Sequence, residues 1–339
     1  MKVLIKTFGC IQNTADSEKI RAYFWERGDQ EVSRINQADL VVINSCVVRQ
    51  SAENRVYGLI KNIKDQLGGD GKNVKIIVTG CLAGIKRKID GAEVWPMGKF
   101  RASGVLRDKS QAAMVSISYG CNHFCSYCIV PLARSRQTDR SEAEILAEAA
   151  RVKKDGFKEI ILIGQSVNSW GRGQFPKLLE KVTKMKFDKV SFISSNPWDF
   201  SDKLIGVIRK YTNIDRKLHI PVQSGDDGIL KRMNRGYTAN DYLRLIQKIR
   251  SQIAGVRIST DILIGFPQED RQAFNNTLKL CRRAGFVRAY LNKYSPRQGT
   301  VSAKLYQDDV PWKEKQRRWR VLEKLVNKKT RSPKVAVGR

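Results

Sequence analysis

Three short apolar runs near the N-terminus constrain the fold of this chain more than any other feature. They are VLIK at 3–6, DLVVINSC at 39–46 and NVKIIVTGC at 73–81. Two stretches with helical periodicity lie between them, at 14–28 and 52–67. Strand, helix, strand, helix, strand in this order predicts a doubly wound parallel sheet.

A cysteine stands at or just after the end of each of these runs, at Cys10, Cys46 and Cys81. In an open parallel sheet, ligands bind in the crevice beyond the carboxyl ends of the strands. Cysteines that are far apart in the sequence would therefore meet in one place, which predicts a metal site. The alternative is three small buried residues, because free cysteine packs well in protein cores.

A second group of cysteines lies in SYGCNHFCSYCIVP, and consists of Cys121, Cys125 and Cys128. Thiolates hold iron–sulfur clusters, and each iron of a 4Fe-4S cluster needs one outside ligand. Three cysteines therefore leave the fourth iron open to a substrate. The alternative is a zinc site with His123 as fourth ligand, but His123 lies only two residues from Cys121 and from Cys125, which makes tetrahedral convergence awkward.

From residue 113 the alternation of strand and helix patterns restarts. The strand candidates are 114–118, 159–164, 189–194, 217–222, 256–265 and 287–295. Six β/α units in about 190 residues fit a partial or complete parallel barrel, whose active site lies at the C-terminal ends of its strands. The three-cysteine loop follows the first of these strands, so we expect it on the active-site face.

Charge and hydropathy indicate the class of partner and the compartment. The chain has 63 Lys and Arg against 33 Asp and Glu, a net charge of +30. This favours nucleic acid as a partner, the alternative being a highly soluble basic protein. The basic segment from Trp312 is expected to contact an RNA backbone, the alternative being a solvated terminal helix. Without a long apolar run or a signal peptide, a cytoplasmic protein is expected.

A disulfide framework is not expected in that compartment, where grouped cysteines are more often metal ligands or catalytic. The seventh cysteine, Cys281, lies in the helical pattern NTLKLCRRAG without a cysteine nearby in the sequence. We interpret it as a packing residue.

The motifs resemble a known family. CNHFCSYC matches the CxxxCxΦC loop of radical S-adenosylmethionine (SAM) enzymes, with Tyr127 as the aromatic residue. FGCIQNTADSE, INSCVVR and TGCLAG resemble the cysteine segments of the methylthiotransferase N-terminal domain. GQSVNSWG, SSNPWDF, LHIPVQSGDDGILKRMNRGYT, STDILIGFP and YSPRQGT resemble successive segments of that family's barrel. The resemblance covers roughly 2–305 and is closest to the MiaB-type branch.

The resemblance implies the chemistry. The open iron of the Cys121, Cys125 and Cys128 cluster would bind the amino and carboxylate groups of SAM. Reductive cleavage of SAM would give a 5′-deoxyadenosyl radical that removes hydrogen from C2 of isopentenylated adenosine beside the tRNA anticodon. A second 4Fe-4S cluster, on the three N-terminal cysteines, would deliver sulfur, and a second SAM the methyl group. Radical chemistry suits this C–H bond because no side-chain base could deprotonate it at neutral pH.

The resemblance also implies a domain organisation. It places a methylthiotransferase N-terminal domain with the auxiliary cluster at 1–84, a connecting region at 85–112 and a radical SAM barrel, partial or complete, at 113–305. Residues 306–339 would form a basic helix and tail where the family usually has a small β-barrel RNA-binding domain. The expected partners are tRNA and a reductant protein such as flavodoxin or ferredoxin, and the protein is expected to be a monomer without membrane contact.

Further residues are expected to contact SAM or the substrate because they are polar or small and follow barrel strands. They are Gly164, Gln165, Ser194, Asn196, Gln223 and Ser224, with Tyr127 in the cysteine loop. Asp261 and Arg297 are similar candidates. The alternative is that these residues only cap strands and turns.

Three other functions remain open on the sequence. Two use the same fold: methylthiolation of threonylcarbamoyl adenosine in tRNA, or of an aspartate in a ribosomal protein. The third is of another class, a non-catalytic metal-containing RNA-binding protein.

Overall fold

The computed structural model describes residues 1–48, 50–67, 74–86 and 88–328. The chain divides into two compact units. Unit 1 comprises residues 1–122 and 129–140, and unit 2 comprises residues 123–128 and the chain from Ser141 onward. The four domain ranges expected from the sequence stay a prediction.

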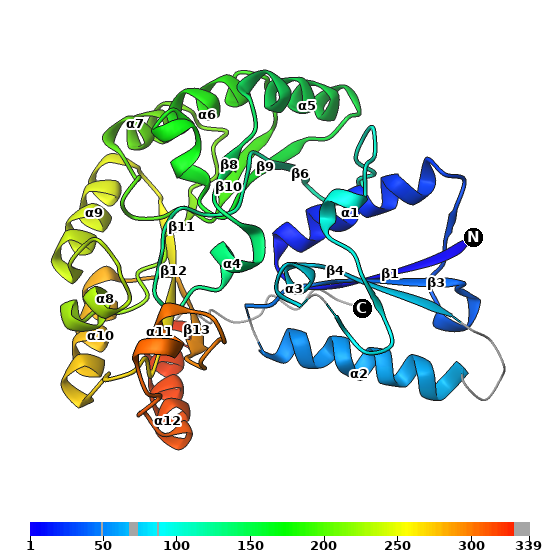
Figure 1. Cartoon of the computed structure of the whole chain (residues 1–339). Coiled ribbons are helices and arrows are strands. Elements are labelled where there is room, and N and C mark those ends of the chain that lie inside the picture. The colour runs from blue at the N-terminus through cyan, green and yellow to red at the C-terminus, as the bar shows by residue number, and fades with distance from the viewer. Residues whose placement is uncertain (49, 68–73, 87, 329–339) are drawn as a thin grey trace, which may run out of the picture. The chain divides into compact units, whose positions relative to one another are not determined.

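Unit 1 contains a five-stranded parallel sheet in the order β2-β1-β3-β4-β5. The strands are β1 (Lys2–Phe8), β2 (Gln30–Glu31), β3 (Leu40–Ser45), β4 (Lys75–Gly80) and β5 (Glu93–Val94). Helix α1 (Ile11–Trp25) covers one face of this sheet and α2 (Gln50–Leu67) the other (Figure 1). The predicted doubly wound sheet is therefore confirmed.

Continuous apolar runs give this sheet two buried faces, as expected for a sheet covered by helices on both sides. Val3 and Leu40 pack in one core cluster with Ile20 and Phe24 of α1. The residues next to them in the strands pack in a second cluster, with α2: Leu4, Val41, Ile43, Ile76, Val78, Val56, Ile60 and Ile63. Successive strand residues thus alternate between the two helices.

Helix α1 begins earlier than its sequence pattern predicts. It starts at Ile11, and Cys10 is its N-cap in extended conformation. The side chain of Asn13 accepts the N–H of Cys10 at 3.3 Å. This bond satisfies a donor at the helix start and extends the helix back to the cysteine.

The rest of unit 1 comes from both sides of the cysteine loop. It includes α3 (Cys81–Ile85), β6 (Ala113–Ser116), the antiparallel pair β7 (Ser118–Tyr119) and β8 (Thr138–Asp139), α4 (Val130–Arg134) and the short helices η1 (Ile35–Gln37) and η2 (Met97–Lys99). Helices α3 and α4 approach so closely that a Cβ at Gly84 would lie 2.0 Å from the carbonyl oxygen of Ala133. The predicted strand at 114–118 falls on β6 and β7.

Unit 2 is built from parallel strands and covering helices. The strands β9 (Glu159–Ile163) and β10 (Lys189–Ile193) pair in parallel, as do β11 (Lys217–His219), β12 (Arg257–Ile264) and β13 (Arg288–Lys293). The helices are α5 (Glu142–Lys154), η3 (Val167–Arg172), α6 (Phe175–Thr183), α7 (Asp202–Lys210), α8 (Asp227–Arg232), α9 (Ala239–Gln252), α10 (Arg271–Ala284), α11 (Val301–Leu305) and α12 (Trp312–Leu322).

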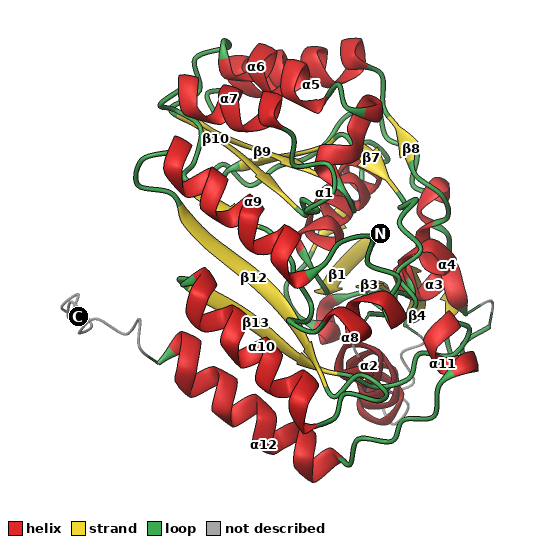
Figure 2. Cartoon of the chain, turned by 90° about the vertical axis from the view of Figure 1, so that its left-hand side faces the viewer, coloured by secondary structure: helices red, strands yellow, loops and turns green. Residues whose placement is uncertain are grey.

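Alternating burial along β12 shows which face of its sheet is covered. Ile258, Ile262 and Ile264 are fully buried, whereas Ser259 and Asp261 between them are partly exposed. In Figure 1, α9 and α10 lie on the same side of β12, and Figure 2 shows β12 beside its partner β13. Apart from Thr260, the covered face of β12 is apolar, and Ser259 and Asp261 lie on the other face, as in a β/α barrel wall.

The predicted strand at 217–222 is shorter in the structure, where β11 ends at His219. Pro221 follows, and proline cannot donate to a strand ladder. An isolated parallel bridge between Gln223 and Ile262 then continues the pairing with β12.

The basic segment at the C-terminus begins as the expected helix, α12, followed by a π-helical turn, η4 (Glu323–Asn327). Two of its basic residues are buried. Lys315 donates to the carbonyl of Tyr294 at 3.0 Å, and Arg318 pairs with Glu269 at 2.7 Å. The predicted extended tail at 329–339 lies outside the described residues. No helix in the described ranges combines the length and apolarity that a membrane crossing needs.

Candidate functional site

The N-terminal cysteines emerge at one edge of the unit 1 sheet. The register pairs Phe8 with Ser45 and Ser45 with Gly80, so β1, β3 and β4 end level with one another. Cys10 follows β1, Cys46 follows β3, and Cys81 opens α3 directly after β4. The common edge expected from the sequence is therefore observed, while the role of the three residues as cluster ligands stays a prediction.

The sulfur atoms of this edge differ in their surroundings. Cys46 and Cys81 are buried and Cys10 is exposed. Cys46 accepts the N–H of Val48 at 3.3 Å. The hydrogen bond from Cys81 lowers the pKa of Cys46 to about 7, and the same bond raises the pKa of Cys81 well above its ordinary value. One thiolate therefore forms readily near neutral pH, and thiolate is the form that binds metal.

A buried amide network fixes the strand ends that carry these cysteines. Asn13 donates to the side chain of Asn44 at 3.0 Å, and Asn44 donates to the carbonyl of Asn13 at 2.7 Å. Gly80 has φ +80°, and a Cβ there would lie 2.3 Å from Oδ1 of Asn44. Only glycine fits at this turn.

Arg134 of α4 contacts the N-terminal cysteines, a contact that the sequence did not indicate. Its Nε lies 2.9 Å from Sγ of Cys81, and its Nη2 lies 2.7 Å from Oδ2 of Asp16. Both charged side chains are buried, with 9% and 3% exposed. Burial opposes the charge of Arg134, but Asp16 and Cys81 favour it and the pKa of the guanidinium is raised.

The first residue of the three-cysteine loop follows a turn that requires glycine. Gly120 has φ +73°, and a Cβ there would lie 2.3 Å from the carbonyl oxygen of Arg136. Cys121 is buried and donates its N–H to the carbonyl of Ser135 at 3.3 Å. Within unit 1, the segment after the loop therefore folds back onto its first cysteine.

The other part of the loop belongs to unit 2. The N–H of Cys128 donates to the carbonyl of Cys125 at 2.9 Å. Ser126 donates through its N–H to Met233 at 3.0 Å and through its hydroxyl to Arg232 at 2.7 Å. Both acceptors are carbonyl groups at the end of α8, so this turn is anchored to the helix.

Tyr127, predicted to contact a cofactor, packs against a core cluster of unit 2. The cluster comprises Ile229, Met233, Phe266, Ala273 and Tyr294. Burial raises the pKa of the Tyr127 hydroxyl well above its ordinary value. Its side chain thus helps to fix the loop in unit 2.

Arg235 contacts the middle cysteine of the loop. Its Nη1 lies 3.4 Å from Sγ of Cys125, and its Nη2 donates to the carbonyl of Pro221 at 2.8 Å. The guanidinium lies over the ring of Trp198, 4.4 Å from its centroid, and Nε donates to the hydroxyl of Tyr237 at 2.9 Å. The sequence motif that contains Arg235 was recognised, but its contact with the cysteine was not predicted.

His123 is held by residues that follow β9 and β10. Its ring stacks on Trp198 at 4.8 Å with an interplanar angle of 4°. Nε2 lies 3.0 Å from the hydroxyl of Ser169 and 3.5 Å from Asp199. Although burial opposes ionisation, hydrogen bonds from this network lower the pKa of Asp199 to about 2. These contacts occupy Nε2, which argues against zinc ligation through this nitrogen.

Asn196 is the centre of this network. Its Nδ2 lies 2.6 Å from the Ser166 hydroxyl and 2.9 Å from Asp199, and also 3.1 Å from His123. Its Oδ1 accepts the N–H of Asp199 at 2.9 Å. The amide thus connects the cysteine loop with the ends of two strands.

Two predicted contact residues have a left-handed backbone without being glycine. Ser194, after β10, has φ 71°, and Gln223, beyond β11, has φ 72°. Such conformations are uncommon outside glycine and concentrate at functional sites. The backbone of Gln223 is held by Asp261, whose carbonyl accepts its N–H at 2.9 Å, and by Leu263, which donates to it at 3.0 Å.

The remaining predicted residues occupy different environments. Ser224 is fully buried, 3.4 Å from the hydroxyl of Thr277. Gly164 and Gln165 directly follow β9. Two less favoured candidates are also placed: the carboxylate of Asp261 lies 3.2 Å from His219, and Arg297 is buried.

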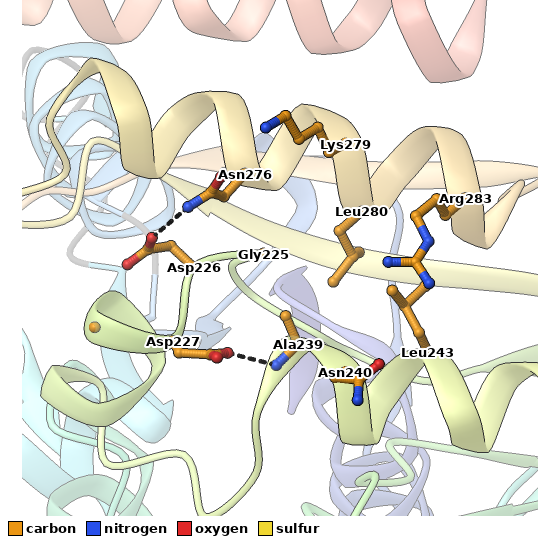
Figure 3. Close-up of a pocket in the computed structure, with 11 residues that line it drawn as sticks. Gly225, Asp226, Asp227, Ala239, Asn240, Leu243, Asn276, Lys279, Leu280 and Arg283 are labelled. Atoms are coloured by element: carbon orange, nitrogen blue, oxygen red, sulfur yellow. Dashed lines mark hydrogen bonds between the residues drawn. The ribbon is translucent and has the colours of Figure 1, made fainter.

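A pocket of about 350 Å³ lies between α8, α9 and α10 in unit 2 (Figure 3). Its two carboxylates are already engaged. Asp226 accepts the side-chain amide of Asn276 at 2.9 Å, and Asp227 accepts the N–H of Ala239 at 2.7 Å. None of the predicted site residues lines the pocket, and we interpret it as a groove between packed helices.

The donor set consists of thiols, which are the ligands that iron–sulfur clusters take. In a four-iron cluster, each thiolate binds a different iron. Buried N–H groups also face the sulfur atoms of Cys81 and Cys125, as is typical of cluster ligands.

Comparison with known proteins identifies the family. Residues 2–92 match the uncharacterized protein family UPF0004, and residues 115–281 match the Radical SAM superfamily. The tRNA-2-methylthio-N(6)-dimethylallyladenosine synthase of Thermotoga petrophila is 36% identical, over 97% of this chain and 83% of the relative. The chain belongs to the methylthiotransferase family of radical SAM enzymes. The protein of the same name from Staphylococcus aureus is 35% identical to this methylthiotransferase, over 95% of the chain and 71% of the relative.

Solved structures support the fold of this methylthiotransferase. The radical S-adenosylmethionine methyltransferase TsrM from Kitasatospora setae has a TM-score of 0.62 at 13% identity, covering 89% of this chain and 77% of that chain. At this identity the likeness shows the fold alone. The predicted α/β fold and the predicted family are thus both confirmed.

Proposed function

We propose that this protein is a tRNA methylthiotransferase that adds a methylthio group to C2 of isopentenylated adenosine beside the anticodon. The observation that carries this proposal is the placement of the N-terminal cysteines at the level ends of three parallel strands. It occurs in a chain that is 36% identical to the Thermotoga petrophila synthase. The net charge of +30 suits a tRNA partner.

Two sets of cysteines would hold two 4Fe-4S clusters. Cys10, Cys46 and Cys81 form one set, and the other consists of Cys121, Cys125 and Cys128. When bound, the clusters supply an electron for cleavage of SAM and a site for the sulfur that is transferred. The lowered pKa of Cys46 favours the thiolate that a cluster needs.

The chain's own residues position the cysteine loop and the cofactor. Asn196 and His123 connect the loop with the ends of β9 and β10. The left-handed backbones of Ser194 and Gln223 turn their peptide groups out of the strand direction, where these groups could contact SAM. The proposed SAM and substrate contacts are Tyr127, Gly164, Gln165, Ser194, Asn196, Gln223 and Ser224.

The proposal assigns roles to the domains and partners. Residues 1–84 would carry the auxiliary cluster and residues 113–305 the radical chemistry, connected by 85–112. The basic segment 306–339 would contact RNA through side chains other than the buried Lys315 and Arg318. A flavodoxin or ferredoxin would supply electrons to a cytoplasmic monomer.

The decisive experiment is mass spectrometry of nucleosides from tRNA that carries isopentenyl adenosine. The tRNA would be incubated anaerobically with reconstituted protein, SAM, a sulfide source and reductant. We expect the 2-methylthio derivative with the native chain, none with Cys125→Ala, and normal product with Cys281→Ala, since Cys281 is a buried residue of α10. Cleavage of SAM with an unchanged nucleoside would refute the substrate and direct attention to threonylcarbamoyl adenosine or a ribosomal-protein aspartate.

A further inference from the structure

One buried arginine donates to one cysteine in each of the two sets. In unit 1, Nε of Arg134 lies 2.9 Å from Sγ of Cys81. In unit 2, Nη1 of Arg235 lies 3.4 Å from Sγ of Cys125. The two residues belong to different elements, since Arg134 ends α4 and Arg235 follows α8. Both guanidinium groups remain charged, because arginine does not lose its proton in proteins.

The charge of Arg134 is balanced within the protein. Its Nη2 pairs with Asp16 at 2.7 Å, and both side chains are almost fully buried. Asp16 also accepts the side-chain amide of Gln12 at 3.2 Å. The sulfur of Cys81 therefore faces an ion pair with no net charge.

The charge of Arg235 is not balanced in this way. Besides Cys125, its contacts in the described part of the chain are the rings of Trp198 and Tyr237, the hydroxyl of Tyr237 and the carbonyl of Pro221. These groups are uncharged, and the arginine residue is 9% exposed. The sulfur of Cys125 therefore faces a full positive charge.

We propose that these arginines are positioning residues that set the reduction potentials of the two clusters in different ways, Arg235 through an unbalanced charge and Arg134 through an ion pair with Asp16. The inference rests on the proposed function, because it assumes that both cysteine sets hold clusters. Hydrogen bonds to the sulfurs and nearby charge are known determinants of cluster potentials.

The physical reason is the extra negative charge of the reduced cluster. A cation close to a ligand sulfur stabilises the reduced form more than the oxidised form, and the effect is strong where water is excluded. Removing the charge of Arg235 lowers the potential of the cluster at Cys125. Removing the charge of Asp16 leaves Arg134 unbalanced and raises the potential of the cluster at Cys81.

The test for Arg235 uses a full-length chain in which only one cluster can form, with Cys10, Cys46 and Cys81 all changed to alanine. Anaerobic redox titration followed by electron paramagnetic resonance gives the potential of the remaining cluster. For Arg235→Gln, we expect at least a tenfold smaller ratio of reduced to oxidised cluster at fixed solution potential, a shift of about 59 mV for one electron. Arg235→Lys keeps the charge and should shift the ratio less.

The test for Arg134 uses the complementary chain, in which Cys121, Cys125 and Cys128 are alanine. Asp16→Asn should raise the ratio of reduced to oxidised cluster, and Arg134→Gln should lower it. A merely structural role would not produce shifts of opposite sign from two partners of one ion pair. Arg140→Gln is the matched control, because Arg140 is a unit 1 arginine that donates to the carbonyl of Ser116 at 2.7 Å.

The outcomes separate this inference from the proposed function. If the remaining cluster forms in every variant of each single-cluster chain and its potential does not move, or if Asp16→Asn and Arg134→Gln move the potential in the same direction, the inference is wrong while the function stands. If neither single-cluster chain binds iron and sulfide, the proposed function and the inference fail together. If Arg235→Gln loses its cluster, Arg235→Lys and Asp16→Asn still test the inference. Each of these variants keeps a positive charge beside its cysteine, and the potential of its cluster can still be measured.

Discussion

Substitution of Gly80 by alanine tests whether the turn after β4 holds the N-terminal cysteines in place. Gly80 has φ 80° and ψ −150°, a region that is essentially reserved for glycine. A Cβ there would also meet Oδ1 of Asn44 at 2.3 Å and the carbonyl of Ser45 at 2.8 Å. The backbone strain costs roughly 1–3 kcal/mol, and displacement of the buried Asn44 amide adds about 1 kcal/mol or more.

We therefore expect Gly80→Ala to destabilise the sheet edge locally by about 2–4 kcal/mol. Hydrogen–deuterium exchange of peptides that cover 40–46 and 75–85 measures this directly. Because about 1.4 kcal/mol corresponds to a tenfold change, exchange there should accelerate by roughly 30- to 1000-fold. The variant should also bind less iron at the N-terminal site than the native chain.

Two other glycines separate the cost of the backbone conformation from the cost of the collision with neighbouring atoms. Gly28 has φ +77° but open space around its Cβ position, so Gly28→Ala should show the conformational cost without the collision. Gly58 lies inside α2, also with open space, and Gly58→Ala should stabilise the helix by about 0.5–1 kcal/mol. Exchange at 75–85 that is unchanged in Gly80→Ala would refute the reasoning.

Two further predictions concern unit 2. Burial raises the pKa of Glu269 from 4.5 to about 6, so the folded protein retains a proton that the unfolded chain releases. The contribution of Glu269 to stability should be greatest below pH 4.5 and should fall by about 2 kcal/mol as the pH rises through 6, and urea unfolding over this range should show a flatter profile for Glu269→Gln. Trp198→Ala removes the partly buried ring that contacts His123 and Arg235, and should cost roughly 1–3 kcal/mol and release iron from the cysteine-loop site. The exposed Trp312 is the control, and equal iron loss from Trp312→Ala would contradict the assignment.

Features encoded by neighbouring residues could be predicted from the sequence. The apolar runs before Cys46 and Cys81 identified β3 and β4, because burial on both faces leaves a continuous apolar pattern. The position of the cysteines followed from a general property of parallel sheets, that their carboxyl ends share an edge. Cys281 is buried in α10, where burial raises its pKa to about 12, as expected of a packing residue.

Features that depend on distant partners could not be predicted in this way. Arg134 and Asp16 are 118 positions apart, and neither has a local pattern that indicates an ion pair. Lys315 and Arg318 belong to the basic helix that was expected to contact an RNA backbone, yet in the folded chain Lys315 donates to a carbonyl group and Arg318 to a buried carboxylate. The sequence shows which charges exist, but only the fold shows which of them are paired.

The discontinuous course of the chain through unit 1 limits how this protein can be divided. Ile129 belongs to the core cluster of the first sheet, and Ala133 packs against that cluster. A fragment that stopped before the cysteine loop would lose both residues, and with them the arginine beside Cys81. The site formed by the N-terminal cysteines therefore cannot be transferred as a short N-terminal fragment. During synthesis on the ribosome, this site is complete only after Arg134 has been added to the chain. Grafting experiments should therefore transfer residues 1–140, which include all of unit 1 and the loop residues 123–128 that belong to unit 2.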